Sequence, residues 1–157
     1  METKVKNEAV DTSHSKQFVV FKLDKEEYGL DIQRVLEIVE PSVITRVPRA
    51  PKFVKGVINL RGEIIPVMGL RERFGLPPIE DTEETRIIIF KVNESSIGAI
   101  VDAVAEVIHL SPDEIEGLSN FSSDNSLDFI YGVGKIDARI VTLLNLDKLV
   151  NYAKREG

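Results

Sequence analysis

Short runs of β-branched and aromatic residues, separated by polar turns, recur along the chain. Val19–Leu23 and Tyr28–Ile32 flank one such turn, and Ile87–Val92 and Ile97–Val101 flank another. Side chains of this kind pack well on a pleated, half-buried surface, so each run predicts a β-strand and each pair of runs predicts a hairpin. The pattern therefore predicts a mostly β structure.

Two further segments predict hairpins with two-residue turns. Val57–Val67 turns at Arg61-Gly62, and Ile136–Leu144 turns at Asp137-Ala138. Pro66 has no N–H to donate to a sheet ladder, so its strand is expected at a sheet edge or at the start of a bulge.

Helical signals in the sequence are short. Arg71–Phe74 is followed by Gly75, the residue type that commonly ends a helix. Ser111–Glu114 combines an N-cap serine, a proline at the first helical position and a capping-box glutamate. Asn145–Glu156 predicts a C-terminal helix with apolar side chains on one face.

The chain contains a weak internal repeat. Gln17–Val39 aligns without a gap to Arg86–Ile108, at an offset of 69 residues (86 against 17), and Phe53–Phe74 aligns to Phe129–Val150, at an offset of 76 (129 against 53). The other interpretation is that any two β-rich stretches look alike, but two ungapped blocks in the same order favour duplication. The matched identities include Phe21/Phe90, Lys22/Lys91, Gly29/Gly98, Val35/Val104, Glu37/Glu106, Gly56/Gly132, Val57/Val133, Ile64/Ile140 and Leu70/Leu146.

Short strands made twice, with little helix, predict an all-β fold of two small barrels packed on each other. Each copy has roughly 65 residues, too few for a large core of its own, so we expect a shared apolar interface. Whether the copies exchange strands is left open. The expected organisation is a flexible tail over residues 1–15 and a single domain over 16–152, with subdomains at about 17–75 and 86–150.

Composition narrows the classes of function. The chain is 43% hydrophobic, enough for a core, and its net charge is −6. An acidic surface argues against binding of nucleic acid or anionic lipid, both of which favour a basic face. The absence of cysteine excludes disulfides, thiolate zinc sites and cysteine nucleophiles. Without a signal peptide or a run of about 20 apolar residues, we expect a soluble, cytoplasmic protein.

The usual catalytic and metal-binding constellations are missing from the sequence. The two histidines, His14 and His109, have no metal-ligand spacing. Gly132–Lys135 fails as a phosphate loop, because Ile136 stands where a Ser or Thr is needed. We therefore expect no cofactor, no metal ion and no catalysis. The alternative is a small-ligand-binding protein or a carboxylate-based enzyme that uses a cleft between the barrels.

The hairpin around Arg61 is the leading candidate for a binding surface. The second copy keeps its apolar frame but has no equivalent of Asn59, Arg61 or Gly62. A guanidinium offers five fixed donors that can bind a partner's carboxylate. It can instead form an internal salt bridge to Glu37 or Glu63, and both roles can hold at once.

Val35, Glu37 and Ile38 form a second candidate patch. In a strand, Val35 and Glu37 share one face and Ile38 lies on the other. The alternative is that Val35 and Ile38 belong to the core.

Several segments resemble the CheW-type chemotaxis adaptor family. They are EEYGLDIQRVLEI (Glu26–Ile38), FVKGVINLRGEIIPV (Phe53–Val67), GLRERFG (Gly69–Gly75) and IGAIVDAVAEVI (Ile97–Ile108), and the resemblance covers about residues 16–152. It implies two SH3-like five-stranded barrels with short helices, and no catalysis. Two other binding modules are considered: the adaptor half of a CheV-type protein and a detached regulatory domain of the kinase.

The resemblance also implies two protein partners for a chain that is a monomer when isolated. Adaptors of this family bind the regulatory domain of the histidine kinase CheA by end-to-end barrel contact. They bind the cytoplasmic tip of methyl-accepting chemoreceptors in a groove between the barrels, which recruits them to membrane-associated arrays. By position, the expected partner surfaces include Val35, Glu37, Ile38, Gly56, Asn59, Leu60, Arg61, Ile87, Val101 and Val104. A second kinase contact is expected at Glu116 and Phe121.

Overall fold

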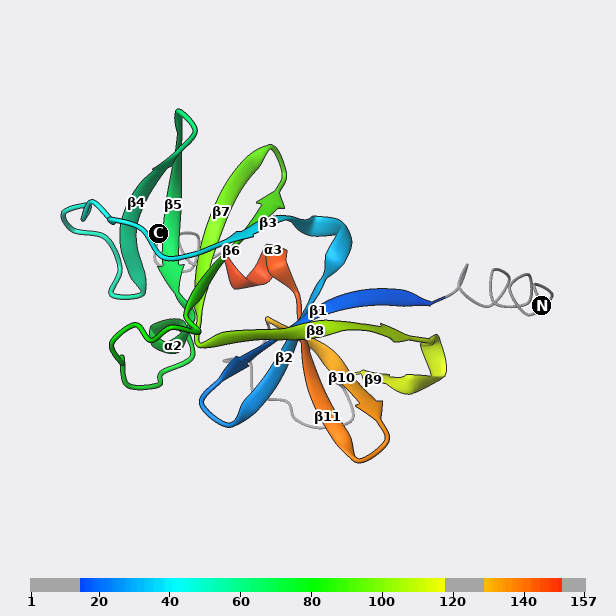
Figure 1. Ribbon diagram of the computed structural model, residues 1–157. Coiled ribbons are helices and arrows are strands. Elements are labelled where there is room, and N and C mark those ends of the chain that lie inside the picture. The colour runs from blue at the N-terminus through cyan, green and yellow to red at the C-terminus, as the bar shows by residue number, and fades with distance from the viewer. Residues whose placement is uncertain (1–14, 118–128, 151–157) are drawn as a thin grey trace. The chain divides into compact units, whose positions relative to one another are not determined.

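The computed structural model describes residues 15–117 and 129–150. These residues form strands joined by tight turns, with a few single-turn helices (Figure 1). The strands are β1 (Lys16–Leu23), β2 (Glu26–Asp31), β3 (Val35–Val39), β4 (Val54–Leu60), β5 (Glu63–Gly69), β6 (Arg86–Val92), β7 (Ser95–Val101), β8 (Ala103–Leu110), β9 (Ile115–Gly117), β10 (Ile130–Ile136) and β11 (Arg139–Leu144). The helical turns are η1 (Ile32–Arg34), α2 (Leu70–Arg73), η2 (Pro112–Glu114) and α3 (Leu146–Leu149). The predicted all-β fold class is confirmed.

The strands make two sheets, which belong mainly to two compact units. The six-stranded unit has the order β8-β1-β2-β11-β10-β9, and the five-stranded unit has the order β3-β6-β7-β5-β4. Of the described residues, the six-stranded unit comprises 15–20, Glu27–Ile32, 106–117 and 129–150, and the five-stranded unit comprises Phe21–Glu26 and Gln33–Ala105. Both are SH3-like. The expectation of five strands in each was wrong for the first unit, because the short strand β9 adds to the edge of β10.

The two sheets share one topology. The hairpin β6–β7 lies between β3 and β5 in one sheet, and the hairpin β1–β2 lies between β8 and β11 in the other. Each sheet therefore combines the first hairpin of one sequence copy with the later strands of the other copy. The parallel pairs also have equivalent registers, since Val67 pairs with Gly98 and the matched residues Leu143 and Gly29 pair with each other. The topology supports the repeat, while the subdomain limits near 17–75 and 86–150 stay a prediction.

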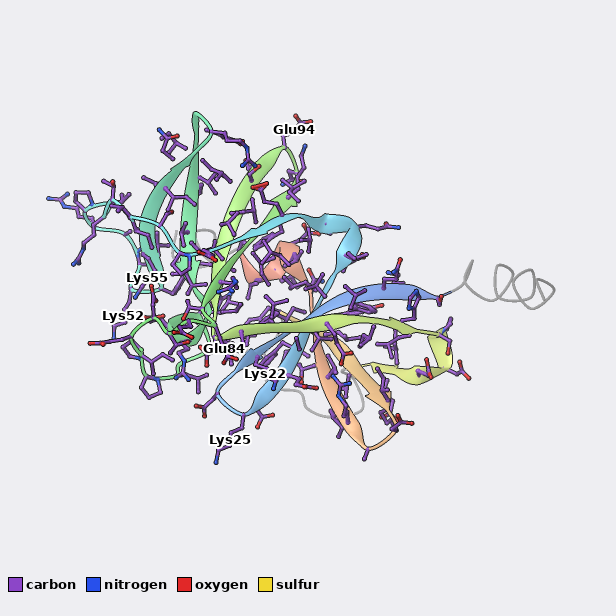
Figure 2. All side chains as sticks on the ribbon, viewed as in Figure 1. Lys22, Lys25, Lys52, Lys55, Glu84 and Glu94 are labelled. Atoms are coloured by element: carbon purple, nitrogen blue, oxygen red, sulfur yellow. The ribbon has the colours of Figure 1, made fainter. Side chains whose placement is uncertain are left out.

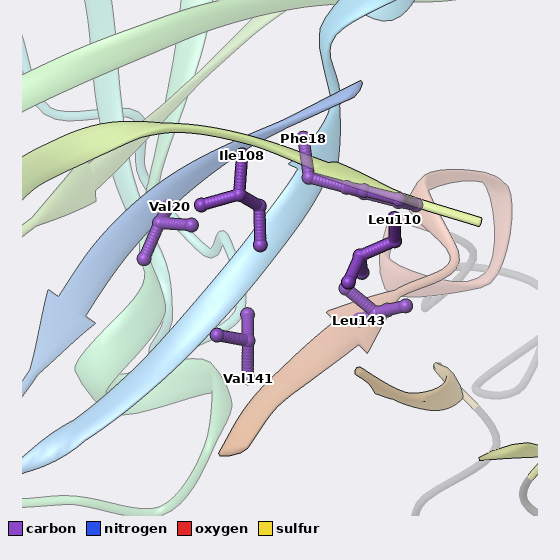
Figure 3. Close-up of a cluster of buried hydrophobic side chains, with 6 residues drawn as sticks. All are labelled: Phe18, Val20, Ile108, Leu110, Val141 and Leu143. Carbon is purple, nitrogen blue, oxygen red and sulfur yellow. The ribbon is translucent and has the colours of Figure 1, made fainter. Parts of the chain in front are cut away.

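Each unit has an apolar core, and the two cores share the matched pairs Phe18/Ile87, Val20/Ile89, Ile65/Val141 and Val67/Leu143. In the six-stranded unit, side chains of β1, β8 and β11 form the cluster in Figure 3, namely Phe18, Val20, Ile108, Leu110, Val141 and Leu143. In the five-stranded unit the cluster is Ile58, Ile65, Val67, Ile87 and Ile89. Burial of one such side chain stabilises the fold by about 1.5–3 kcal/mol.

One pair of matched core positions differs in size. Ile58 in the five-stranded unit corresponds to Gly134 in the six-stranded unit. A Cβ atom on Gly134 would lie 2.5 Å from Cδ1 of Leu110. Leu110 therefore fills the space beside the glycine, and the core stays packed despite the missing side chain.

Each unit is closed by a segment that crosses from one edge strand of its sheet to the other. After β3, the chain reaches the outer edge of β4, where the N–H and C=O groups of Thr45 each bond Val57 at 2.9 Å. After β8, strand β9 reaches the outer edge of β10, where Glu116 pairs with Val133. These pairings satisfy backbone groups that an open sheet edge would leave exposed.

A glycine allows each crossing segment to approach. Gly56 has a φ of 145°, and a Cβ atom there would lie 2.1 Å from the carbonyl oxygen of Thr45. A Cβ atom on Gly132 would lie 2.6 Å from the carbonyl oxygen of Glu116. This close backbone approach gives a physical reason for the glycine that both sequence copies carry at this position.

The β4–β5 hairpin agrees with its predicted turn but not with the predicted place of its proline. Arg61 and Gly62 have φ values of 50° and 88°, as a type I′ turn requires. Pro66 was expected at a sheet edge, or at the start of a bulge. The edge assignment was wrong, because β5 lies between β4 and β7. The pairing of β5 with β7 begins at Val67, one residue after the proline.

The predicted helical segments form single turns. Gly75 follows α2 with a φ of 81°, and its N–H donates to the carbonyl of Glu72 at 3.1 Å. The N–H of Ser111 donates to Oε1 of Glu114 at 2.8 Å, as the capping box predicts. The predicted helix from Asn145 is described only over α3 and Val150, and its remainder lies outside the described residues.

We expect Gly56→Ala to lower the free energy of unfolding by about 2–4 kcal/mol, because the new Cβ must displace the carbonyl of Thr45 at an unfavourable φ. Urea unfolding followed by circular dichroism measures the change. Gly117→Ala is the matched control, since a Cβ there has nothing within 4 Å. Equal stability of the two variants would contradict the role given to Gly56.

Candidate functional site

Most of the predicted partner residues lie on the two edge strands of the five-stranded unit. Strand β3 carries Val35, Glu37 and Ile38, and strand β4 with its turn carries Gly56, Asn59, Leu60 and Arg61. In the sheet order, β3 and β4 are the first and last strands. The structure brings residues of the two strands together at one point, the side chains of Glu37 and Arg61.

Glu37 and Arg61 form an ion pair between the two edges. Nη2 of Arg61 donates to both carboxylate oxygens of Glu37, so the internal salt bridge considered from the sequence is confirmed. The hydrogen bond from Arg61 lowers the pKa of Glu37, and the same contact raises the pKa of Arg61. The Arg61 side chain remains 70% exposed, against 29% for Glu37. A partner carboxylate or carbonyl can therefore still reach the guanidinium.

The neighbours of Arg61 hold the turn in place. Oδ1 of Asn59 accepts a hydrogen bond from the N–H of Gly62 at 2.9 Å, across the turn. Leu60 is half-buried and packs against the core of the unit. Gly56 is buried beside Thr45 at the crossing segment. Of these predicted site residues, Asn59 is exposed, Leu60 packs against the core, and Gly56 contacts the crossing segment rather than the turn.

Strand β3 also presents apolar side chains to solvent, at positions that alternate with Glu37. Leu36 is 52% exposed and Ile38 is 40% exposed, whereas Val35 is half-buried. The alternative that Ile38 belongs to the core is therefore wrong, because its side chain lies on the solvent face of the strand. On the hairpin, Ile64 is 60% exposed and pairs with Asn59. Leu36 and Ile64 were not among the residues predicted from the sequence, although the alternation along each strand could have indicated them.

The predicted residues of the second sequence copy are less accessible within the unit. Ile87 and Val101 have no exposed surface, and Ile87 belongs to the core cluster. Val104 is half-buried. Ile87 and Val101 therefore shape the five-stranded unit from inside rather than presenting side chains on its surface.

The proposed second kinase contact is only partly described. Glu116 is half-buried in β9, and its Oε1 lies 3.4 Å from Nζ of Lys135 on β10. Phe121 and the predicted tail up to residue 14 lie outside the described residues.

The six-stranded unit contains an ion pair equivalent to Glu37–Arg61. Glu106 matches Glu37 in the repeat, and its Oε2 lies 2.6 Å from Nη1 of Arg139. Arg139 begins β11, two residues after Asp137, which is the aligned counterpart of Arg61. Both units thus bind the matched glutamate with an arginine of the hairpin, taken from different positions. The lack of an aligned arginine has a structural explanation and does not by itself argue for a partner.

Arg71 anchors the turn after β5, and sequence reasoning missed its role. Its Nε and Nη2 donate to the carboxylate of Asp102 at 2.9–3.2 Å, and its Nη2 also lies 3.1 Å from Oδ1 of Asp24. Its Nη1 donates to the carbonyl of Pro77 at 2.9 Å. Asp102 accepts a further bond from the N–H of Asp24 at 2.7 Å. One guanidinium therefore fixes three turns, which a linear pattern of residues does not reveal.

Within residues 15–117 and 129–150, no group of three or more His, Cys, Asp or Glu side chains could hold a metal ion. In the same part of the chain, no helix is long and apolar enough to cross a membrane. The developed features are instead exposed side chains on paired edge strands. This β structure therefore offers exposed side chains on edge strands for contact with another protein.

The chain belongs to the CheW-like domain family, whose model matches residues 17–154, and its role is that of a chemotaxis adaptor. It is 37% identical over 134 residues to the chemotaxis protein CheW of Helicobacter pylori, covering 85% of this chain and 81% of that protein. It is 33% identical to the chemotaxis protein CheW of Klebsiella aerogenes, covering 86% and 81%. The crystal structure of the scaffolding protein TtCheW from Thermoanaerobacter tengcongensis matches with a TM-score of 0.79 and 40% identity, covering 87% and 92%.

We expect Asp102→Asn to lower the free energy of unfolding by about 1–3 kcal/mol at neutral pH, with a smaller difference in acid. Burial acts to raise the pKa of Asp102, but the bonds from Arg71 and from the N–H of Asp24 outweigh it and leave the pKa below its ordinary value. A depressed pKa stabilises the fold above the unfolded pKa, and this stabilisation is lost as the pH falls through the folded pKa.

Urea unfolding of the wild type and the variant across pH tests this expectation. Asp137→Asn, which removes an exposed turn carboxylate, serves as the control. A stability difference for Asp102→Asn that stays constant into acid would show that the ionised carboxylate is not the cause.

Proposed function

We propose that this adaptor links chemoreceptors to the histidine kinase CheA by protein binding and performs no reaction. The observation that carries the proposal is the Glu37–Arg61 pair, in which the arginine side chain is 70% exposed, on a unit whose strands β3 and β5 also carry solvent-facing Leu36, Ile38 and Ile64. Arginine beside exposed apolar side chains is the composition that protein interfaces favour. An enzyme or a small-ligand-binding protein would instead need several polar groups that point into one enclosed pocket.

The kinase contact is proposed at this surface. Leu36 and Ile38 lie on an edge strand, where a partner barrel can pack against apolar side chains and exclude water from the ion pair. Exclusion of water strengthens the attraction between Glu37 and Arg61, provided that the partner satisfies the remaining donors of the guanidinium. Asn59 holds the turn in the conformation that presents these donors. The predicted contact at Glu116 and Phe121 is a second proposed kinase surface.

The receptor contact is proposed from the sequence positions that the family resemblance indicates. A helical receptor tip fits an apolar groove through side chains on one helix face, with polar groups setting its register. Val104 is half-buried and can contribute surface, whereas Ile87 and Val101 contribute shape. Binding of both partners at once makes the second contact intramolecular, so several weak interfaces can give a tight assembly in the cytoplasm.

We expect Arg61→Ala to weaken binding of the CheA regulatory domain or of a receptor-tip fragment about tenfold, because an exposed arginine at the centre of an interface is costly to remove. Glu37→Lys is expected to act in the same direction through charge reversal. Isothermal titration with each partner fragment measures the affinities. Unchanged affinities of Arg61→Ala for both fragments would refute the proposed site.

A double-mutant cycle separates binding from folding. Glu37→Ala, Arg61→Ala and the double variant are compared for both affinity and thermal stability. Glu106→Ala is the matched control, since Glu106 is the counterpart of Glu37 and its loss removes the equivalent ion pair, while Arg139 keeps its other bond to Glu27. A loss of thermal stability without loss of affinity would assign the Glu37–Arg61 pair a structural role only.

A further inference from the structure

A positively charged loop joins β3 to β4 in this acidic chain. Arg46, Arg49, Lys52 and Lys55 lie within residues 44–55, which contain no acidic residue, although the net charge of the whole chain is −6. We call residues 44–55 the basic loop. Positive charges that are close together repel each other, so gathering them in one loop has an energetic cost. The loop also has the opposite sign of charge to the chain as a whole.

The basic loop forms a shallow hollow of about 630 Å³. Figure 2 shows Lys52 and Lys55 beside the start of β4. Apolar surface is mixed with the charges, and Val47 is 44% exposed. The hollow is lined only by residues of the loop, which are Ile44, Arg46, Val47, Pro48, Arg49, Ala50, Pro51, Lys52, Val54 and Lys55.

Of the four cations, Lys55 forms an ion pair. Nζ of Lys55 binds the carboxylate of Glu72 at 2.7 Å. Arg46, Arg49 and Lys52 are exposed, and none of them has an acidic partner among the residues that the structure describes. Their charges are therefore available to an external anion.

The backbone of the basic loop is restrained before any ligand binds. Arg49 has a φ of 65°, a conformation disfavoured for a residue with a Cβ atom. Pro48 and Pro51 fix their own φ angles, and the N–H of Val54 donates to the carbonyl of Pro51 at 2.9 Å. A restrained loop loses little conformational entropy on binding.

We propose that the basic loop binds an extended acidic segment of another protein. The unpaired cations fit carboxylates, and Val47 with the two prolines fits apolar residues between them. An adjoining hollow shares Lys55 but also carries Glu72, Glu80 and Asp81, and Glu80 and Asp81 are exposed. A flat anionic bilayer would meet these carboxylates, whereas a narrow peptide can avoid them. This surface is additional to the Glu37–Arg61 site, and its test needs neither proposed partner.

Fluorescence anisotropy with a labelled peptide of alternating glutamate and leucine tests the proposal on the full chain. We expect the triple variant R46Q/R49Q/K52Q to bind it about tenfold more weakly, because several exposed ion pairs are lost together. The triple variant K22Q/K25Q/K91Q has the same net charge and loses only exposed lysines outside the loop, so its affinity should stay within about twofold. Equal losses in the two variants would reduce the effect to net charge and overturn the proposal.

Two further measurements complete the test. Arg49→Gly relieves the left-handed conformation, so it should keep or raise thermal stability while weakening peptide binding. Loss of stability with unchanged affinity would show that Arg49 is structural and overturn its assigned role. Vesicles of phosphatidylglycerol should not bind. Binding of the vesicles without binding of the peptide would show that the ligand of the basic loop is a lipid surface and would overturn the proposal.

Discussion

In each unit, a segment of backbone crosses the end of a curved sheet and contacts a glycine, which lies on β4 in one unit and on β10 in the other. Thr45 meets Gly56 and Val57 in one unit, and Glu116 meets Gly132 in the other. A sheet of five short strands has two edges, and unpaired edges invite association with other chains. The crossing segment pairs with one of these edges in each unit, through Thr45 on β4 and through β9 on β10. The rest of each unit depends on this contact, because it turns a sheet into a closed core.

Closure of the sheet also explains the place of the charged side chains. The matched glutamates Glu37 and Glu106 lie on the equivalent strands β3 and β8, and each is bound by an arginine of the hairpin that follows in the chain. The arginines come from different positions, Arg61 at the turn and Arg139 on the following strand. The interaction is thus kept while the residue that provides it changes. At the turn, the guanidinium is 70% exposed, which makes that copy of the pair available to a partner.

In this fold, different residues provide stability and binding, which suits an adaptor. The cores and the glycine contacts carry the stability, so solvent-facing positions such as Leu36, Ile38 and Ile64 can be selected for binding. The basic loop is another solvent-facing surface of this kind. It extends the crossing segment beyond Thr45, and its charged side chains belong to neither core cluster. A scaffold can therefore present several separate surfaces on one small fold, as assembly of a multi-protein complex requires.

Much of this arrangement is readable in the sequence. Strand and turn patterns are local, so the hairpins around Asp24, Arg61, Asn93 and Asp137 could be placed from neighbouring residues alone. The repeat indicated two equivalent units, and the family resemblance indicated partner binding. The Glu37–Arg61 bridge was considered from charge alone, as one of two options.

The tertiary structure decided what depends on residues far apart in the chain. Pairing of β2 with β11 and of β7 with β5 is parallel and long-range, and no local pattern specifies it. For the same reason, the clamp of Arg71 on Asp102 and the choice of Arg139 as partner of Glu106 could not be predicted. Local periodicity fixes which residues form a strand and which face is apolar. Which strands meet, and which charges then lie within bonding distance, is set by closure of the whole sheet.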